Sequence, residues 1–236
     1  MNEQELIKKF VPKDKQTEAL DKLVAGYPVQ YIIGNVDFYD CDIKVNENVL
    51  IPRFETELLV DKTIALLKSK FSKQISIADL GTGSGAIAIA LKKNVDSLVT
   101  GFDISDKAIE VAKENALLNN VEIEFINHDI HNKIPGKYDC IISNPPYLLK
   151  GSEVADPVKY EPELALYASD DGLEYYYKIL DYAEEVLNEE YLIAFEIGLN
   201  QSDRIMDYAK KKLFNANVWA ENDLTGQIRY IFITNE

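Results

Sequence analysis

The stretch Asp79-Leu80-Gly81-Thr82-Gly83-Ser84-Gly85-Ala86 lies between an apolar run and a helical pattern. The run 75–80 predicts a buried strand, and 86–93 predicts the helix that follows it. The glycines permit a tight turn and the close approach of a ligand, and the N-terminus of the helix presents free N–H groups. We therefore expect a strand, a ligand-binding loop and a helix in direct succession.

The same alternation continues toward the C-terminus. Ser105 is the expected N-cap of the second helix. The further strands are expected at 98–103, 122–127, 138–143 and 191–197, and the further helices at 105–118, 170–187 and 202–213. Segments 218–221 and 228–234 have the pattern of an antiparallel pair. Strands that alternate with helices predict an α/β fold, a doubly wound and mostly parallel sheet with helices on both faces.

The part of the chain before residue 56 is organised differently. Two short helices are expected at 3–10 and 13–25, and the alternating segments 36–39 and 41–45 predict a β-hairpin. This divides the chain into a short helical segment (1–26), a hairpin with linker (27–54) and a main domain (55–236). The two helices are too short for a core of their own, so we expect them to pack on the main domain.

The composition argues against several classes of protein. No apolar run approaches the ~20 residues of a membrane span, and the acidic start of the chain is unlike a signal peptide. Cys41 and Cys140 lie far apart in the sequence and form no ligand pattern, which suggests a reducing cytoplasm. Because His128 and His131 are the only histidines, we expect no metal site.

The 236-residue chain carries a formal net charge of −15. Proteins bind phosphate backbones through basic surfaces, so we do not expect a nucleic acid as the main partner. A basic protein partner fits this charge better. We expect the protein to be a monomer.

Acidic residues accompany three successive predicted strands. Asp79 precedes the glycine loop, Asp103 ends the second strand and Asp129 follows the third. The spacing Gly-x-Gly-x-Gly is shorter than the dinucleotide fingerprint Gly-x-Gly-x-x-Gly. Asp79 suits an amine, Asp103 is placed to bind ribose hydroxyls, and Asp129 can accept from an adenine amino group while Ile130 packs on the ring. An amine, ribose hydroxyls and an adenine are all parts of S-adenosylmethionine, so the three acids predict a site for this cofactor. The alternative is that Asp103 and Asp129 only cap turns.

The segment Ser143-Asn144-Pro145-Pro146-Tyr147 follows a buried strand and is suited to hold a planar NH2 group. The side-chain carbonyl of Asn144 accepts one N–H, and a carbonyl of the rigid proline pair can accept the second. Tyr147 would cover the planar group with its ring. Two acceptors without a base suit methylation of an amide or an exocyclic amine. The alternative is a rigid loop after a strand.

Arg53, Glu55 and Glu57 lie around the start of a predicted helix at 56–71. The helix macrodipole favours anions at this position, so the two glutamates need no further role. Arg53 would then be their ion-pair partner on the surface. The alternative is that all three residues line a substrate site.

Several further motifs carry a resemblance that runs from about Gly26 to the C-terminus. They lie at 28–34, 50–57, 79–85, 144–147, 160–162, 171–173 and 196–198. With these motifs the chain resembles the N5-glutamine methyltransferases that modify peptide chain release factors (the HemK/PrmC group). Two features depart from the family pattern: Phe54 stands where the family usually has proline, and only a short segment precedes the shared region where the family usually has a domain of several helices.

The resemblance implies a class I S-adenosylmethionine-dependent methyltransferase, with a seven-stranded, mostly parallel sheet whose last strand is antiparallel. It implies that the glutamine of a Gly-Gly-Gln loop in a release factor is methylated on its amide nitrogen. The candidate catalytic residues are Asn144, Pro145, Pro146 and Tyr147, and these four together with Arg53, Glu55 and Glu57 are the candidate substrate-binding residues. The candidate cofactor-binding residues are Asp79, Gly81, Thr82, Gly83, Ser84, Gly85, Asp103, Ile104, Asp129, Ile130 and Asn144.

Three rival interpretations stay open from the sequence. An adenine-N6 DNA or RNA methyltransferase uses a similar site on a flipped base, but the charge of −15 argues against it. A ribosomal-protein glutamine methyltransferase is closer, although the segment 53–57 favours the release-factor branch. A degenerate fold that only binds a partner is the non-enzymatic alternative, and the intact acids, glycines and Asn144 argue against it.

Overall fold

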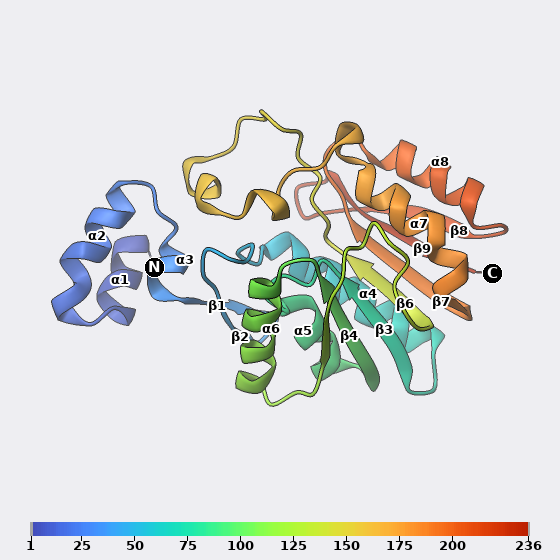
Figure 1. The fold of residues 1–236 in the computed structure, drawn as a ribbon, viewed down its shortest axis with the longest axis horizontal. Coiled ribbons are helices and arrows are strands. Elements are labelled where there is room, and N and C mark those ends of the chain that lie inside the picture. Colours follow the sequence, from blue (N-terminus) through green and yellow to red (C-terminus); the bar gives the residue numbers. More distant parts are fainter. Residues whose placement is uncertain (1, 236) are drawn as a thin grey trace.

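The computed structural model describes residues 2–235 and contains a seven-stranded sheet, which lies at its centre (Figure 1). The strand order is β5-β4-β3-β6-β7-β9-β8. The first five strands in this order run parallel to one another, and β9 is antiparallel to its two neighbours, β7 and β8. The strands are β3 (Ile75–Leu80), β4 (Ser97–Asp103), β5 (Glu124–Asn127), β6 (Tyr138–Ser143), β7 (Leu187–Glu196), β8 (Asn217–Asn222) and β9 (Ile228–Thr234). The predicted sheet is therefore confirmed, including its antiparallel last strand.

Helices cover both faces of this sheet, as the alternating pattern predicted. Side chains alternate between the two faces along each strand. Ile77 and Cys140 thus pack against the helices α4, α5 and α6, whereas Ala78 and Ile141 pack against α7 and α8. The bounds are α4 (Phe54–Lys70), α5 (Ala86–Asn94), α6 (Asp106–Leu118), α7 (Glu174–Val186) and α8 (Ser202–Lys212).

The helix predicted at 170–187 has a different start. Asp170, Asp171 and Gly172 form the short 3-10 helix η4, with φ values of 51°, 55° and 79°, and α7 begins only at Glu174. Left-handed residues cannot continue a right-handed helix, so the chain turns sharply before α7. The other 3-10 helices are η1 (Lys13–Lys15), η2 (Asp156–Tyr160) and η3 (Glu163–Ala165).

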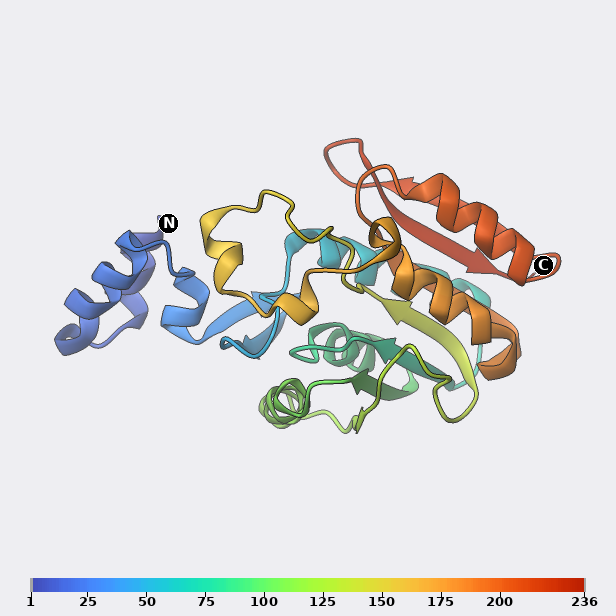
Figure 2. The ribbon, with the colours of Figure 1, turned by 45° about the horizontal axis from the view of Figure 1, so that its top comes forward.

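The N-terminal helices lie at one end of the molecule (Figures 1 and 2). They pack mainly on one another, around the buried side chains of Ile7, Ala19 and Val29, and Tyr160 donates a hydrogen bond to the carbonyl of Ala25 from the main domain. The expectation that they pack on the main domain is therefore wrong for most of their surface, because a third helix that the sequence did not predict completes this small cluster. The helices are α1 (Glu3–Phe10), α2 (Gln16–Val24) and α3 (Val29–Ile33).

The predicted hairpin consists of β1 (Asn35–Phe38) and β2 (Cys41–Lys44). Asn115 on α6 fixes it to the main domain, because its side-chain amide accepts from the N–H of Lys44 and donates to the carbonyl of Lys44. The linker after the hairpin thereby passes the carboxyl ends of the parallel strands. Within residues 2–235, no helix is long and apolar enough to cross a bilayer.

Candidate active site

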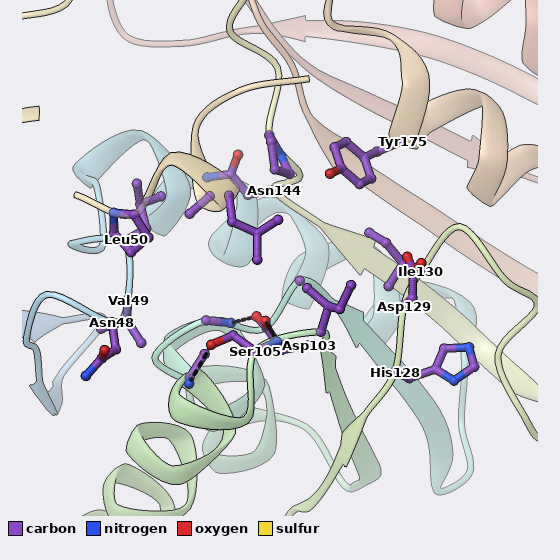
Figure 3. Close-up of a pocket in the computed structure, with 18 of the residues that line it drawn as sticks. Asn48, Val49, Leu50, Asp103, Ser105, His128, Asp129, Ile130, Asn144 and Tyr175 are labelled. Carbon is purple, nitrogen blue, oxygen red and sulfur yellow. Dashed lines mark hydrogen bonds between the residues drawn. The ribbon is translucent and has the colours of Figure 1, made fainter. Parts of the chain in front are cut away.

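Two cavities meet at Asn144, on the carboxyl edge of the parallel strands. The first has a volume of about 240 Å³ and lies over the ends of β3, β4 and β5, and the second has a volume of about 230 Å³ and lies beside the segment after β6. Leu50, Asn144 and Ala165 line both cavities. Figure 3 shows how Asn144, Asp103 and Asp129 lie around the first cavity.

The glycine loop forms part of the wall of the first cavity. Gly81, Gly83 and Gly85 all have positive φ, at 73°, 53° and 80°, which side chains rarely adopt. Gly81 and Gly83 line the cavity. A Cβ atom at Gly85 would lie 3.1 Å from the Cβ of Ala112, so a glycine is also needed for the close packing of α5 on α6.

Asp79 lies beneath this loop and not on the cavity wall. It is 0% exposed, and its Oδ2 accepts the hydroxyl of Thr82 at 2.6 Å. Its Oδ1 is buried and has no hydrogen-bond partner within the described part of the chain. Burial raises the pKa of Asp79 to about 7. A buried, incompletely bonded carboxylate under the loop favours a positively charged ligand group above it.

Asp103 lines the first cavity at the end of β4. Its two carboxylate oxygens accept the backbone N–H groups of Gly83 and Ser105, both at 2.9 Å. Burial raises the pKa of Asp103. Ser105 caps α6 as predicted, because its hydroxyl oxygen accepts from the N–H of Ala108. The carboxylate therefore holds two loops in place and still faces the cavity.

Asp129 is part of a chain of charges at the far end of the first cavity. Its Oδ1 accepts from the backbone N–H and the Nδ1 of His131, and the Nε2 of His131 lies 2.8 Å from Glu174 on α7. Burial alone would lower the pKa of His131, but the two carboxylates raise it. The ring of Tyr175 lies 4.8 Å from that of His131. This end of the cavity is thus anchored to α7.

Asn144 is held by residues of two other elements. Its Nδ2 donates to the hydroxyl of Thr56 on α4 at 3.1 Å, and that hydroxyl contacts the Oε2 of Glu196 on β7 at 2.7 Å. Thr56 and Glu196 are 5% and 2% exposed. Burial raises the pKa of Glu196 to about 7. Neither residue was among the sequence candidates, although each lies inside one of the quoted motifs.

The backbone after Asn144 is fixed by Gln201. The Nε2 of Gln201 donates to the carbonyl oxygens of Tyr147, Asp171 and Gly172, and its Oε1 accepts from the N–H of Gly198. A Cβ atom at Gly172 would lie 2.2 Å from the carbonyl oxygen of Tyr147, so no side chain fits there. The second cavity therefore has a rigid floor.

Arg53 joins two segments that lie above the cavities. Its guanidinium donates to Glu161 and to the carbonyl of Ile51, and Glu161 accepts from the N–H of Ile51. The suggested surface pair with Glu55 or Glu57 is therefore wrong, since the described partner of Arg53 is the buried carboxylate of Glu161. Arg53 also lines the second cavity, whereas Glu55 and Glu57 line neither cavity.

The remaining candidates divide by position. The cofactor candidates that line the first cavity are Gly81, Gly83, Asp103, Ile104, Asp129, Ile130 and Asn144. Those that lie behind its wall are Asp79, Thr82, Ser84 and Gly85. Pro146 lines the first cavity, and Asn144, Pro145 and Tyr147 line the second. The opposite wall is formed by Asn48, Val49, Leu50, Pro162, Leu164, Ala165 and Tyr175. Leu50 and Pro162 belong to the motifs at 50–57 and 160–162, whereas the sequence did not point to the other five.

Comparisons with known proteins agree with this geometry. Residues 56–159 match the family described as "Methyltransferase small domain". A release factor glutamine methyltransferase from Streptococcus pneumoniae is 43% identical over 216 residues, which are 90% of this chain and 76% of the relative.

Two solved structures are also similar. One is the release-factor-specific protein-(glutamine-N5) methyltransferase of Alicyclobacillus acidocaldarius, with 26% identity, a TM-score of 0.52 and coverage of 82% of this chain and 99% of that chain. The other is a Thermus thermophilus 16S rRNA methyltransferase solved with AdoMet and guanosine. Its TM-score is 0.61 over 86% of this chain and 50% of that chain, and at 13% identity it shares the fold alone.

The sheet, the cavity at its carboxyl edge and the family match define a class I S-adenosylmethionine-dependent methyltransferase. Within this class, the identity with the Streptococcus enzyme over most of both chains is decisive. The chain belongs to the release factor glutamine methyltransferase family.

Proposed function

We propose that Asn144 and the segment after β6 hold the side-chain amide of a release-factor glutamine, whose nitrogen receives a methyl group. The observation that carries this assignment is the position of Asn144 between the two cavities. Its Nδ2 is engaged by Thr56, which leaves its Oδ1 as the acceptor for a substrate N–H. The side chain of Asn144 can therefore accept a hydrogen bond from the amide nitrogen that is to be methylated.

An amide nitrogen is a weak nucleophile because its lone pair is delocalised into the carbonyl. Hydrogen bonds from both of its N–H groups to Asn144 Oδ1 and the carbonyl of Pro145 would orient the nitrogen and increase its electron density. S-adenosylmethionine, when bound, supplies a methyl group on a positively charged sulfur. Most of the rate enhancement should then come from orientation and electrostatics. The methylated amide nitrogen loses its extra proton after the methyl transfer.

The first cavity suits the cofactor. All five residues of this assignment line the cavity: Gly81 and Gly83 would allow close approach of the cofactor, Asp103 would accept from the ribose hydroxyls, and Asp129 and Ile130 would contact the adenine. The buried carboxylate of Asp79 favours the cationic part of the cofactor. The donor set of the cavity therefore fits S-adenosylmethionine.

The second cavity suits a narrow, uncharged peptide segment. Apart from Arg53, which is paired with Glu161, the polar side chains among its lining residues are those of Asn144 and Tyr147. The apolar part of the lining consists of Leu50, Pro145, Leu148, Val154, Ala155, Val158, Ala165 and Leu166. A loop of glycines around one glutamine meets these limits, which supports a release factor as the partner.

Three further assignments belong to this proposal. The segments 1–26, 27–54 and 55–236 act as a helical segment, a hairpin with linker and a catalytic domain, which the separate cluster around Ile7 supports. The enzyme acts as a monomer. It works in the cytoplasm, which the free thiols of Cys41 and Cys140 support.

The test is methyl transfer from labelled S-adenosylmethionine to a release factor, to its variant with the loop glutamine replaced by alanine, and to duplex DNA, with the product mapped by mass spectrometry. Label is expected only on the loop glutamine. Asn144→Ala removes the acceptor oxygen and should lower the rate by about 100-fold or more, as loss of one preorganised transition-state partner does. Label on adenine, or an unchanged rate in Asn144→Ala, would contradict the proposal.

A further inference from the structure

Two buried residues stand behind Asn144 on elements far apart in the sequence. Thr56 lies in the first turn of α4, and Glu196 is the last residue of β7. The hydroxyl of Thr56 lies between the Nδ2 of Asn144, at 3.1 Å, and the Oε2 of Glu196, at 2.7 Å. The three side chains form one continuous hydrogen-bonded chain that ends at the shared wall of the cavities.

The direction of this chain follows from counting protons. A threonine hydroxyl has one proton to donate, and an ionised carboxylate can only accept. The proton of Thr56 therefore goes to Glu196, and the oxygen of Thr56 is left to accept from Asn144. With its NH2 group turned to Thr56, Asn144 presents its Oδ1 to the cavities.

The opposite orientation of the amide would not serve the reaction. The two ends of an asparagine amide have nearly the same shape, so neighbouring donors and acceptors decide which end faces a site. A flipped Asn144 would present its own NH2 group to the NH2 group of the acceptor. Donor would face donor, and the acceptor nitrogen would lose a hydrogen bond that increases its electron density.

We propose that Thr56 and Glu196 are positioning residues that lock the amide of Asn144 with its carbonyl oxygen toward the acceptor nitrogen. The inference rests on the proposed function, in which that oxygen accepts an N–H of the glutamine. It adds two residues that touch neither substrate nor cofactor and act through Asn144.

Protonation of Glu196 would release this lock. A neutral carboxyl can donate to Thr56, whose proton is then free to bond to the Oδ1 of a flipped Asn144. Since burial raises the pKa of Glu196 to about 7, the lock is closed above that pH and opens below it. The other titratable or charged groups that act on Glu196 are Arg53, Glu55, Tyr147, Tyr176, Arg229 and Tyr230.

The first test compares three variants of α4. Thr56→Val keeps the shape but removes the hydroxyl, and Thr56→Ser keeps the hydroxyl. Thr63→Val is the matched control, because Thr63 is also buried on α4 but donates only to the carbonyl of Leu59 in its own helix. Turnover is measured at saturating release factor and cofactor, and cofactor affinity is measured by calorimetry.

Thr56→Val should lower kcat by about 10- to 100-fold, the range found when partners that orient metal ligands are removed. Thr56→Ser should restore kcat to within a few-fold of the wild type, and Thr63→Val should leave it unchanged. Cofactor affinity should be the same in all three variants, which also shows that they are folded.

The second test is the pH profile of kcat at saturating cofactor, for the wild type and Glu196→Gln. The wild-type kcat should fall as the pH is lowered through about 7, and Glu196→Gln should lose this inflection because its side chain does not titrate. Saturation with cofactor separates Glu196 from Asp79, whose pKa is also raised to about 7 but which lies under the cofactor loop.

The outcomes separate this inference from the function on which it rests. A wild-type kcat in Thr56→Val, or the same inflection in Glu196→Gln, overturns the lock while glutamine methylation stands. If the wild type itself transfers no methyl group to the loop glutamine, the proposed function fails first.

Discussion

Asp79 and Glu196 are two buried carboxylates in the two halves of the site. Each accepts the hydroxyl of a threonine, at 2.6 Å from Thr82 and at 2.7 Å from Thr56. Burial raises the pKa of both to about 7. They differ in their origin: Thr82 follows Asp79 by three residues, whereas Thr56 and Glu196 are separated by 140.

This difference shows how the two halves are assembled. The Asp79–Thr82 pair is formed by one strand and the loop after it, so the geometry beneath the cofactor loop is set locally. The acceptor half needs α4, β6 and β7 to be packed correctly before Asn144 is held. Variants of the two carboxylates should therefore separate cofactor binding from the chemical step.

The largest effect concerns stability against pH. The pKa of each group in the folded protein is about 7, above the ordinary values of 3.8 for Asp79 and 4.5 for Glu196. At a pH between the ordinary and the raised value, the folded protein therefore binds more protons than the unfolded protein. This stabilisation is complete below the ordinary pKa and is lost as the pH rises through about 7. As the pH rises across this range, each group should lower the free energy of unfolding by on the order of 3 kcal/mol.

Urea denaturation at a series of pH values checks this prediction. Asp79→Asn and Glu196→Gln should each flatten the pH dependence relative to the wild type, and the comparison cancels the other titrating groups. Identical slopes in all three proteins would show that the two carboxylates are not neutralised by burial.

The next effect concerns cofactor affinity. Asp79→Asn should weaken the binding of S-adenosylmethionine about tenfold at pH 8, or about 1.4 kcal/mol, because a cationic ligand loses a buried negative charge beneath it. The wild-type affinity should rise with pH through about 7, and the variant should lose this rise. Calorimetry measures both, with Glu196→Gln as the control that keeps the wild-type affinity. If both variants bound S-adenosylmethionine equally weakly, the separation of cofactor binding from the chemical step would be wrong.

The smallest effect concerns the hydroxyl of Thr82. The hydroxyl of Thr82 orients the carboxylate of Asp79 without carrying its charge. Thr82→Val should therefore weaken cofactor binding less than loss of the charge does, roughly fivefold, or about 1 kcal/mol. Its kcat at saturating cofactor should stay at the wild-type level. Thr56→Val should do the opposite: it should lower kcat and leave the cofactor affinity unchanged. A loss of kcat in both variants would contradict the comparison.

Contacts between near neighbours in the sequence were predictable. The glycine loop, the cap at Ser105 and the acids after successive strands follow from local rules, and the structure places them as expected at one edge of the sheet. Parallel strands bring their carboxyl ends together, so even the meeting of Asp103 and Asp129 at one cavity needed no tertiary information.

Contacts between distant segments were not predictable from any local pattern. Arg53 lies next to two glutamates in the sequence, yet it pairs with Glu161, because the chain after β6 folds back over the linker. Thr56 appears only as a helix residue between two acids, and its role depends on where β7 ends. The wall formed by Asn48, Val49 and Leu50 likewise exists only because the hairpin docks on α6.

The wall that the two cavities share has a consequence for inhibitor design. Leu50, Asn144 and Ala165 line both spaces, so the two cavities adjoin, and a single molecule with two linked parts is the natural inhibitor to test. An adenosyl group tethered to a primary carboxamide would occupy both at once. Binding of the first part would raise the effective concentration of the second, so that two weak fragments combine into one tight ligand.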